Sequence, residues 1–168
     1  DIGVALGLIL LVCGPLGTVI GGLMSDRLAR AGHKDAAMRV TVVSIVLMVI
    51  FSVLYPVVEP PSHALGLFAV MVLSASAASA TGAVALVTVS PNQIRAQATA
   101  LYWIVKNLIG LMLGPVSVGL LTDRVFGDAG KVGSSMAIVS AVFGGIGIAA
   151  LVMGARHYKV CVTKVSDQ

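Results

Sequence analysis

Charged residues are scarce in this chain, and their scarcity excludes most soluble functions. Of 168 residues only 11% are charged, whereas 58% are hydrophobic, and the mean hydropathy is +1.03. A typical soluble protein has roughly 25% charged residues, and so few charges cannot cover the surface of a globule this apolar. The composition therefore excludes a water-soluble enzyme, a disordered tail and a nucleic-acid-binding module, although the net charge is +4.

Cysteine is also rare. Cys13 lies in the middle of an apolar run, and Cys161 lies in a basic segment 148 positions later. Two cysteines at that separation form neither a disulfide framework nor a metal-binding motif. We expect both thiols to be unpaired, and we expect the chain to use no metal and no cofactor.

Uncharged runs are long. Five runs carry no charged residue apart from Lys106, and they cover residues 2–24, 40–58, 64–90, 98–122 and 133–155. A bilayer core about 30 Å thick needs roughly 20 helical residues, and each run is too long and too uniform for a barrel strand. The sequence therefore predicts an all-α polytopic membrane protein with five transmembrane helices embedded in a lipid bilayer.

The basic residues between these runs predict an orientation. Eight of them lie in the first loop, the third loop and the C-terminal tail, whereas only Arg124 and Lys131 lie on the other side. Lysine and arginine concentrate in cytoplasmic loops of membrane proteins. We therefore expect the N-terminus to face outward and the C-terminus to lie in the cytoplasm.

Two short segments of the chain resemble each other. The segment GLMSDR ends at Asp26-Arg27, and GLLTDR ends at Asp123-Arg124. The offset is 97 residues and three spans, and an odd number of spans puts the two copies on opposite sides of the membrane. This arrangement is typical of the inverted three-helix repeats of transporters, and chance similarity between two apolar helices is the alternative.

The repeat predicts how the chain is organised. Residues 64–155 form one three-helix unit, and residues 1–58 hold the last two helices of another, with a basic cytoplasmic loop at 25–39. A basic cytoplasmic tail follows at 156–168. One helix of the first unit then precedes Asp1, so we expect the chain to be part of a longer protein.

The segment from Gly22 to Arg30 resembles the cytoplasmic loop signature of the major facilitator superfamily. It has a glycine, three further residues, Asp26-Arg27 and then Arg30. Residues 90–128 are similar to the tenth-to-eleventh helix region of bacterial spinster-like members of that superfamily. The similar positions are Pro91-Asn92, Arg95, Asn107 with Gly110, Gly114-Pro115, and Asp123 followed by Val125-Phe126-Gly127.

This resemblance implies a fold and a mechanism. The five spans would correspond to helices 8–12 of a twelve-helix fold in the bacterial inner membrane, and they would rock against a missing N-terminal helical bundle of the same protein. Gly22, Asp26, Arg27 and Arg30 would form a cytoplasmic gating motif that latches the two halves. Spinster-like kinship implies a small or amphipathic substrate of lipid-like or anionic character. Lys106 departs from the family, in which an apolar residue is expected there.

Lys106 is the main candidate for the substrate pathway. A lysine near the centre of a membrane helix costs about 2.5–3.5 kcal/mol on insertion scales, so something must offset it. It could bind an anionic substrate group, pair with a carboxylate in the missing half, or extend toward the headgroups. Tyr102 and Asn107 are further candidates for the substrate pathway. Tyr102 shares the helix face of Lys106 at a spacing of four residues, and for Asn107 an interhelical hydrogen bond is favoured over a ligand contact.

Glycines spaced four apart allow two helix backbones to approach closely. Gly17 and Gly21 have this spacing, as do Gly110 and Gly114, and Gly119 belongs to the repeated segment. We expect these positions to be helix-packing sites.

The acidic residues and histidines all lie outside the five spans. The spans therefore offer neither a proton relay nor the dyad of an intramembrane protease, and we expect no enzyme. The sequence favours a secondary active transporter that moves a small-molecule substrate by alternating access. The alternatives are a major facilitator transporter of an unrelated metabolite or drug, and a five-span membrane subunit without transport activity.

Overall fold

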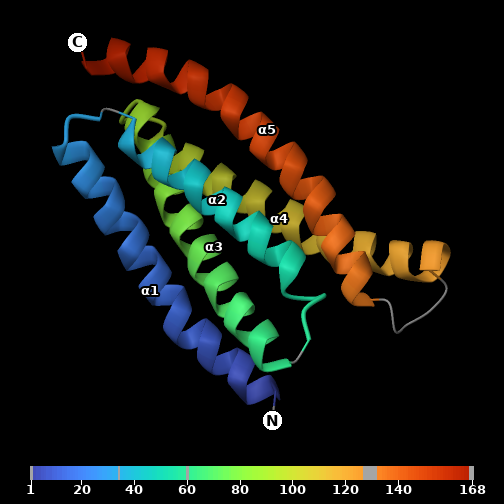
Figure 1. The fold of residues 1–168 in the computed structure, drawn as a ribbon. Coiled ribbons are helices and arrows are strands. Elements are labelled where there is room, and N and C mark those ends of the chain that lie inside the picture. The colour runs from blue at the N-terminus through green and yellow to red at the C-terminus, as the bar shows by residue number, and fades with distance from the viewer. Residues whose placement is uncertain (1, 34, 60, 127–131, 167–168) are drawn as a thin grey trace.

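The computed structural model describes residues 2–33, 35–59, 61–126 and 132–166, and over these residues the chain is helical without a strand (Figure 1). Its five α-helices are long and apolar enough to cross a membrane, which confirms the predicted helical architecture. The helices are α1 (Ile2–Arg30), α2 (Ala36–Leu54), α3 (Pro61–Val89), α4 (Arg95–Leu121) and α5 (Val132–Ser166), and one π-helical turn, η1 (Thr122–Phe126), follows α4.

The first connection is shorter than the loop expected at 25–39. Helix α1 continues through the charged motif to Arg30, and α2 begins at Ala36. Arg27 and Arg30 occupy the last turn of α1, where a positive charge stabilises the helix dipole. Gly32, with φ of 88°, then reverses the chain, because this left-handed conformation suits a glycine after a helix. The charged residues Asp26 and Arg27 end the uncharged run, but the helix continues through them.

Two other boundaries also differ from the uncharged runs. Helix α2 ends at Leu54 although the apolar run reaches residue 58, because Pro56 has no backbone N–H to continue the helical ladder. Helix α5 continues to Ser166, through most of the segment expected to be a tail. Hydropathy located the spans, but it did not give the residues at which α2 and α5 end.

Helix α3 lies in the middle of the bundle. It packs along much of its length against α1 and α2, and α5 packs against α2 (Figure 1). Helix α4 has fewer contacts, which it makes with α3 and α5. The α1–α2 turn, the α3–α4 turn and the C-terminal end of α5 lie at one end of the bundle. We call this the basic end, because the sequence places most of its Lys and Arg residues there.

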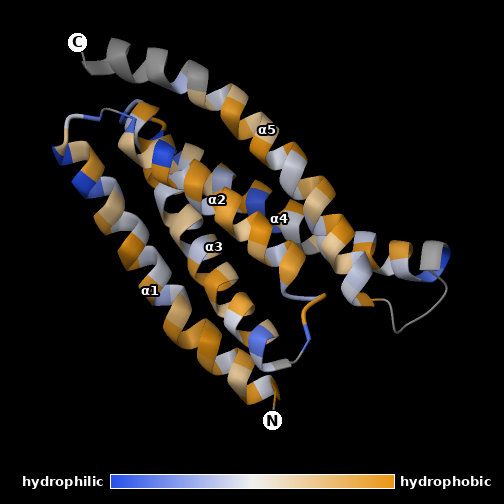
Figure 2. Ribbon diagram, in the orientation of Figure 1, coloured by the Kyte–Doolittle hydropathy of each residue, from blue (hydrophilic) through white to orange (hydrophobic). Residues whose placement is uncertain are grey.

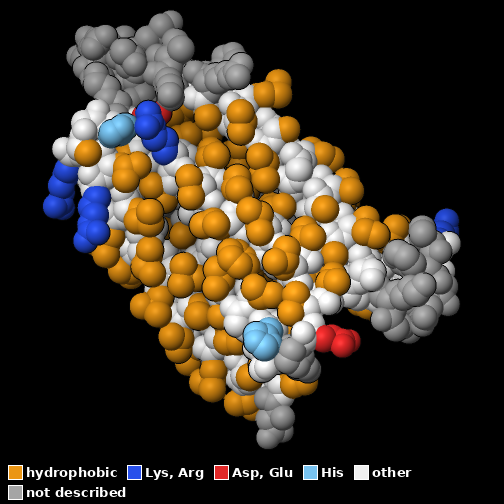
Figure 3. All heavy atoms as spheres, in the orientation of Figure 1, with side chains coloured by type: hydrophobic (Ala, Val, Ile, Leu, Met, Phe, Trp, Pro, Cys, Tyr) orange, Lys and Arg blue, Asp and Glu red, His pale blue; other side chains and the backbone are white. Residues whose placement is uncertain are grey.

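The interior is built from small residues, and the large apolar residues lie outside. Typical buried residues are Ala77, Ala85 and Thr81, whereas Leu11 is 70% exposed and Met153 69% exposed. Apolar segments cover most of every helix, and apolar side chains cover the face seen in the space-filling view (Figures 2 and 3). A large apolar outer surface of this kind is stable against lipid rather than water. The structure is therefore compatible with an integral membrane protein.

Candidate functional site

A wide hollow opens beside the central helix α3. Its volume is about 1010 Å³. One wall consists of small residues of α3, and aromatic residues of α4 and α5 border it together with methionines of α2 and α3. The lining includes Ala75, Ser76, Ser79, Gly82, Met38, Met48, Met71, Tyr102, Trp103, Lys106 and Tyr158. A concave, largely apolar surface with few polar groups is the usual form of a small-molecule site.

Lys106 brings the one charge to this hollow. Its Nζ donates a hydrogen bond of 2.6 Å to Ser79 Oγ, and Ser79 Oγ in turn donates to the Ala75 carbonyl at 2.8 Å. The ammonium also lies 4.6 Å from the centre of the Trp103 ring, within the range of a cation–π interaction. Among the residues that the structure describes, no carboxylate forms an ion pair with Lys106. Its partners are neutral.

The direction of the Lys106 side chain bears on the three interpretations above. Ser79 lies ten residues before the end of α3, and Lys106 lies eleven residues after the start of α4. At 1.5 Å per residue, both are about 15 Å from the basic end. The ammonium thus crosses to α3 at its own depth instead of extending toward the headgroups. This geometry disfavours a lysine that extends toward the headgroups. The two remaining interpretations are that Lys106 binds an anionic ligand, or that it pairs with a carboxylate outside the described residues.

Tyr102 and Trp103 shape the same region. Their rings meet edge to face, with centroids 5.7 Å apart. The Tyr102 hydroxyl lies so close to Gly82 that a Cβ there would be 2.9 Å from it. Any larger residue at position 82 would therefore displace the tyrosine from its place over α3.

Asn107 does not form the expected interhelical bond. Its Nδ2 donates to the Trp103 carbonyl of its own helix at 2.9 Å, and the residue is exposed. This is a local bond between residues four apart, and it leaves the side chain on the outer side of α4. Tyr102 and Lys106 line the hollow, whereas Asn107 is absent from its lining.

The expected gating motif lies in the last turns of α1. Gly22 is partly exposed, and Asp26, Arg27 and Arg30 are exposed at the basic end. Within the described part of the chain, none of the three charged side chains has a hydrogen-bond or ion-pair partner. The structure does not bring them into contact with the hollow, so their role stays a prediction.

Asp123 and Arg124, the repeat-related pair, lie in η1 beyond the far end of α4 and are exposed. They lie at the opposite end of the bundle from the end of α1 (Figure 1). An inverted repeat requires this placement. Any two segments separated by three spans also lie on opposite sides, so the placement does not by itself distinguish a repeat from chance similarity. Close by, the hydroxyls of Thr122 and the buried Ser135 lie 2.9 Å apart, which joins the end of α4 to the start of α5.

The glycines predicted to pack helices divide into two groups. Gly17 and Gly21 contact α3 directly, since a Cβ on Gly17 would overlap the Leu73 carbonyl oxygen. An added Cβ on Gly110, Gly114 or Gly119 would meet nothing within 4 Å. The first pair is confirmed as a packing site, and the α4 glycines have no packing partner among the described residues.

One charged pair was missed in the sequence. Asp35, at the start of α2, is only 8% exposed, and both its oxygens accept hydrogen bonds of 2.9 Å from Arg39 Nε. Nearby, burial raises the pKa of Tyr158 and the charge of Asp35 adds to the increase, whereas a hydrogen bond with Thr88 opposes it. The spacing of four residues between Asp35 and Arg39 was visible in the sequence, but the burial was not.

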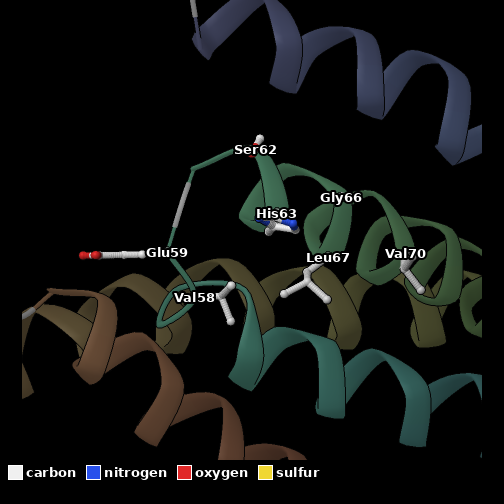
Figure 4. Close-up of a pocket in the computed structure, with 7 residues that line it drawn as sticks. All are labelled: Val58, Glu59, Ser62, His63, Gly66, Leu67 and Val70. Atoms are coloured by element: carbon white, nitrogen blue, oxygen red, sulfur yellow. The ribbon is translucent and has the colours of Figure 1, made fainter.

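A hollow between α2 and α3 at the opposite end carries no catalytic arrangement. It is lined by Val58, Glu59, Ser62, His63, Gly66, Leu67 and Val70. Figure 4 shows Glu59 extending away from the first turn of α3, where His63 lies. The carboxylate and the imidazole therefore do not form an acid–base pair. Over the described residues, no group of three or more metal-ligating side chains is found.

Comparison with family models, with curated proteins and with solved structures found no match to this chain. The family resemblance therefore rests on the motifs quoted above, and any function must be argued from the geometry of the bundle.

Proposed function

We propose that this chain is part of a secondary active transporter of the major facilitator type that moves an amphipathic anion by alternating access. The observation that carries the proposal is Lys106. It is a charged residue inside a membrane span, it lines a wide apolar hollow, and its partners are the neutral Ser79 and Trp103.

The energetics of Lys106 favour an anionic ligand. A hydroxyl and an aromatic ring offset only part of the cost of an ammonium in the membrane, since charged partners bind it more strongly than neutral ones. A carboxylate or phosphate of a ligand would supply the missing charge. The methionines and small residues of the hollow would receive the apolar part of the same ligand, because methionine side chains adapt to varied shapes.

The arrangement of the helices supports the transport mechanism. Helix α4 carries Lys106 and has few contacts with its neighbours, so it is free to pack against a further bundle. In the proposed transporter, that bundle closes the open side of the hollow, and the motif of Asp26, Arg27 and Arg30 latches it at the basic end. Alternating access then consists of rocking one bundle against the other around the Lys106 site.

A binding experiment tests the site in this chain. Trp103 is the only tryptophan and lies against the Lys106 ammonium, so its fluorescence should change when an anion displaces Nζ. We expect decanoate to change the emission of the purified chain and decanol to have a much smaller effect. Lys106→Met should weaken decanoate binding by about tenfold, the equivalent of roughly 1.4 kcal/mol, and Lys106→Arg should retain it.

Equal responses to decanoate and decanol, or equal decanoate affinity in Lys106→Met, would refute the anion site. Transport itself is tested in proteoliposomes of the full-length protein, with uptake of amphipathic anions compared between wild type and Lys106→Met. Uptake of none of them would favour the non-transporting subunit. For the latch, Asp26→Asn should shift the full-length protein away from its outward-open state, and unchanged state populations would exclude that role.

A further inference from the structure

A second groove runs between α2 and α5 at the basic end of the bundle. It has a volume of about 470 Å³, and its lining consists of Asp35, Met38, Arg39, Val42, Val43, Val152 and Ala155. Apart from the charged pair, every lining residue is apolar. Val43 is 54% exposed and Val152 43% exposed, so the groove opens on the outer surface that is suited to lipid.

Arg39 is held in a fixed position at the mouth of this groove. Its Nε donates to both oxygens of the nearly buried Asp35. The two terminal nitrogens of the guanidinium have no hydrogen bond with the other residues that the structure describes. The Arg39 side chain is 46% exposed. A guanidinium that is anchored on one side and open on the other is preorganised to bind a phosphate with its free N–H groups.

The depth of the groove matches that of a phospholipid. Arg39 is the fourth residue of α2, about 6 Å along the helix, and Val43 lies one turn deeper. On α5, the apolar span ends at Ala155, so Val152 lies one turn inside it. The charged mouth is therefore at headgroup level, and the apolar floor continues at the level of the acyl chains.

The charge of this end favours an anionic lipid over a zwitterionic one. In the sequence, segments 25–39, 91–95 and 156–168 together hold eight of the eleven basic residues but only three of the seven acidic residues. Asp35 neutralises Arg39 locally, and the surplus of positive charge comes from the rest of this end. Basic pockets between helices near the cytoplasmic surface bind anionic headgroups.

We propose that the groove between α2 and α5 binds one anionic phospholipid, with its phosphate on Arg39 and an acyl chain along Val43 and Val152. The groove adjoins the Lys106 hollow, since Met38 lines both, but the lipid proposal does not depend on the transport proposal. The bound lipid would lie against the contact between α2 and α5, two helices that are far apart in sequence.

Native mass spectrometry of the purified chain tests this proposal, with phosphatidylglycerol and phosphatidylcholine of the same acyl chains as the probes. We expect wild type to retain one phosphatidylglycerol in preference to phosphatidylcholine. Arg39→Gln should reduce this preference by roughly fivefold, the effect of one basic residue near an anionic surface. Arg30→Gln is the matched control: it removes the same charge from the end of α1, outside the groove lining, so it should reduce the preference much less than Arg39→Gln.

Ala155→Phe is a second variant, which keeps the Asp35–Arg39 pair and fills the groove. It decides the outcome if Arg39→Gln, which removes the Arg39 partner of the nearly buried Asp35, fails to fold. It should lose the retained phosphatidylglycerol, and glycerol phosphate without acyl chains should not displace the lipid from wild type. No preference in wild type, equal losses in Arg39→Gln and Arg30→Gln, or unchanged binding in Ala155→Phe would each overturn the proposal.

Discussion

Gly21 of α1 and Ala77 of α3 are in backbone contact: a Cβ built on Gly21 would lie 2.9 Å from both Cα and Cβ of Ala77. Gly17 makes a similar contact with Leu73 one turn away, and Ser25 is buried one turn further along α1. This line of small residues is the reason that α1 and α3 can pack so closely without large side chains between them.

Enlarging Gly21 should therefore separate α1 from α3. Gly21→Val should destabilise the bundle by about 1–3 kcal/mol, the usual cost of overpacking, as measured by reversible unfolding in detergent. Gly7→Val is the control, because a Cβ at Gly7 meets nothing within 4 Å. Equal stability losses in both variants would show that the effect is helix propensity and not packing.

A buried hydroxyl pair should also contribute to the α2–α3 contact. The hydroxyls of Thr41 and Thr81 lie 2.8 Å apart, and Thr81 is only 1% exposed. Thr81→Val removes the bond at nearly constant volume and should lower the free energy of unfolding by about 0.6–1.7 kcal/mol. Thr99→Val is the control, since the Thr99 hydroxyl bonds only its own helix at an exposed position. Stability lost equally in both would argue against an interhelical contribution.

The predicted orientation can be tested by cysteine labelling. In a background of Cys13→Ala and Cys161→Ala, the exposed residues His33 and Glu59 are each replaced by cysteine. We expect a membrane-impermeant maleimide to label Glu59→Cys in intact cells, and to label His33→Cys only after permeabilisation, because cytoplasmic loops carry the basic residues. The reverse pattern would place the basic end outside.

Tyr158 should make the stability of the basic end sensitive to alkaline pH. Burial raises its pKa above the ordinary value of 10.0, so the neutral phenol is favoured in the folded state. The contribution of the neutral Tyr158 phenol to the free energy of unfolding is fully present below pH 10, and it is lost as the pH rises through the folded-state pKa. Between pH 8 and pH 11, the melting temperature of wild type should fall further than that of Tyr158→Phe. Parallel decreases would mean that Tyr158 is not the titrating group.

The site was only partly predictable from the sequence. Lys106 and Tyr102 were identified because a charge within an apolar span is conspicuous, and both line the hollow. The contact with Ser79 was not predictable, because Ser79 is one of many small polar residues in α3 and nothing local distinguishes it. Asn107 was expected to cross to another helix, but a carbonyl four residues earlier in α4 was the nearer acceptor.

The sequence alone determined that the chain is helical, that five helices can span a membrane, and that the charge is concentrated at one end. These properties depend on local composition, since every backbone polar group in a bilayer must be satisfied within its own helix. Which face each helix turns inward was decided only by the tertiary structure. The helices are apolar on all sides, so no hydrophobic stripe marks a buried face. Gly17 and Gly21 found a partner while Gly110 and Gly114 did not, because the same spacing packs only where a second helix lies opposite it.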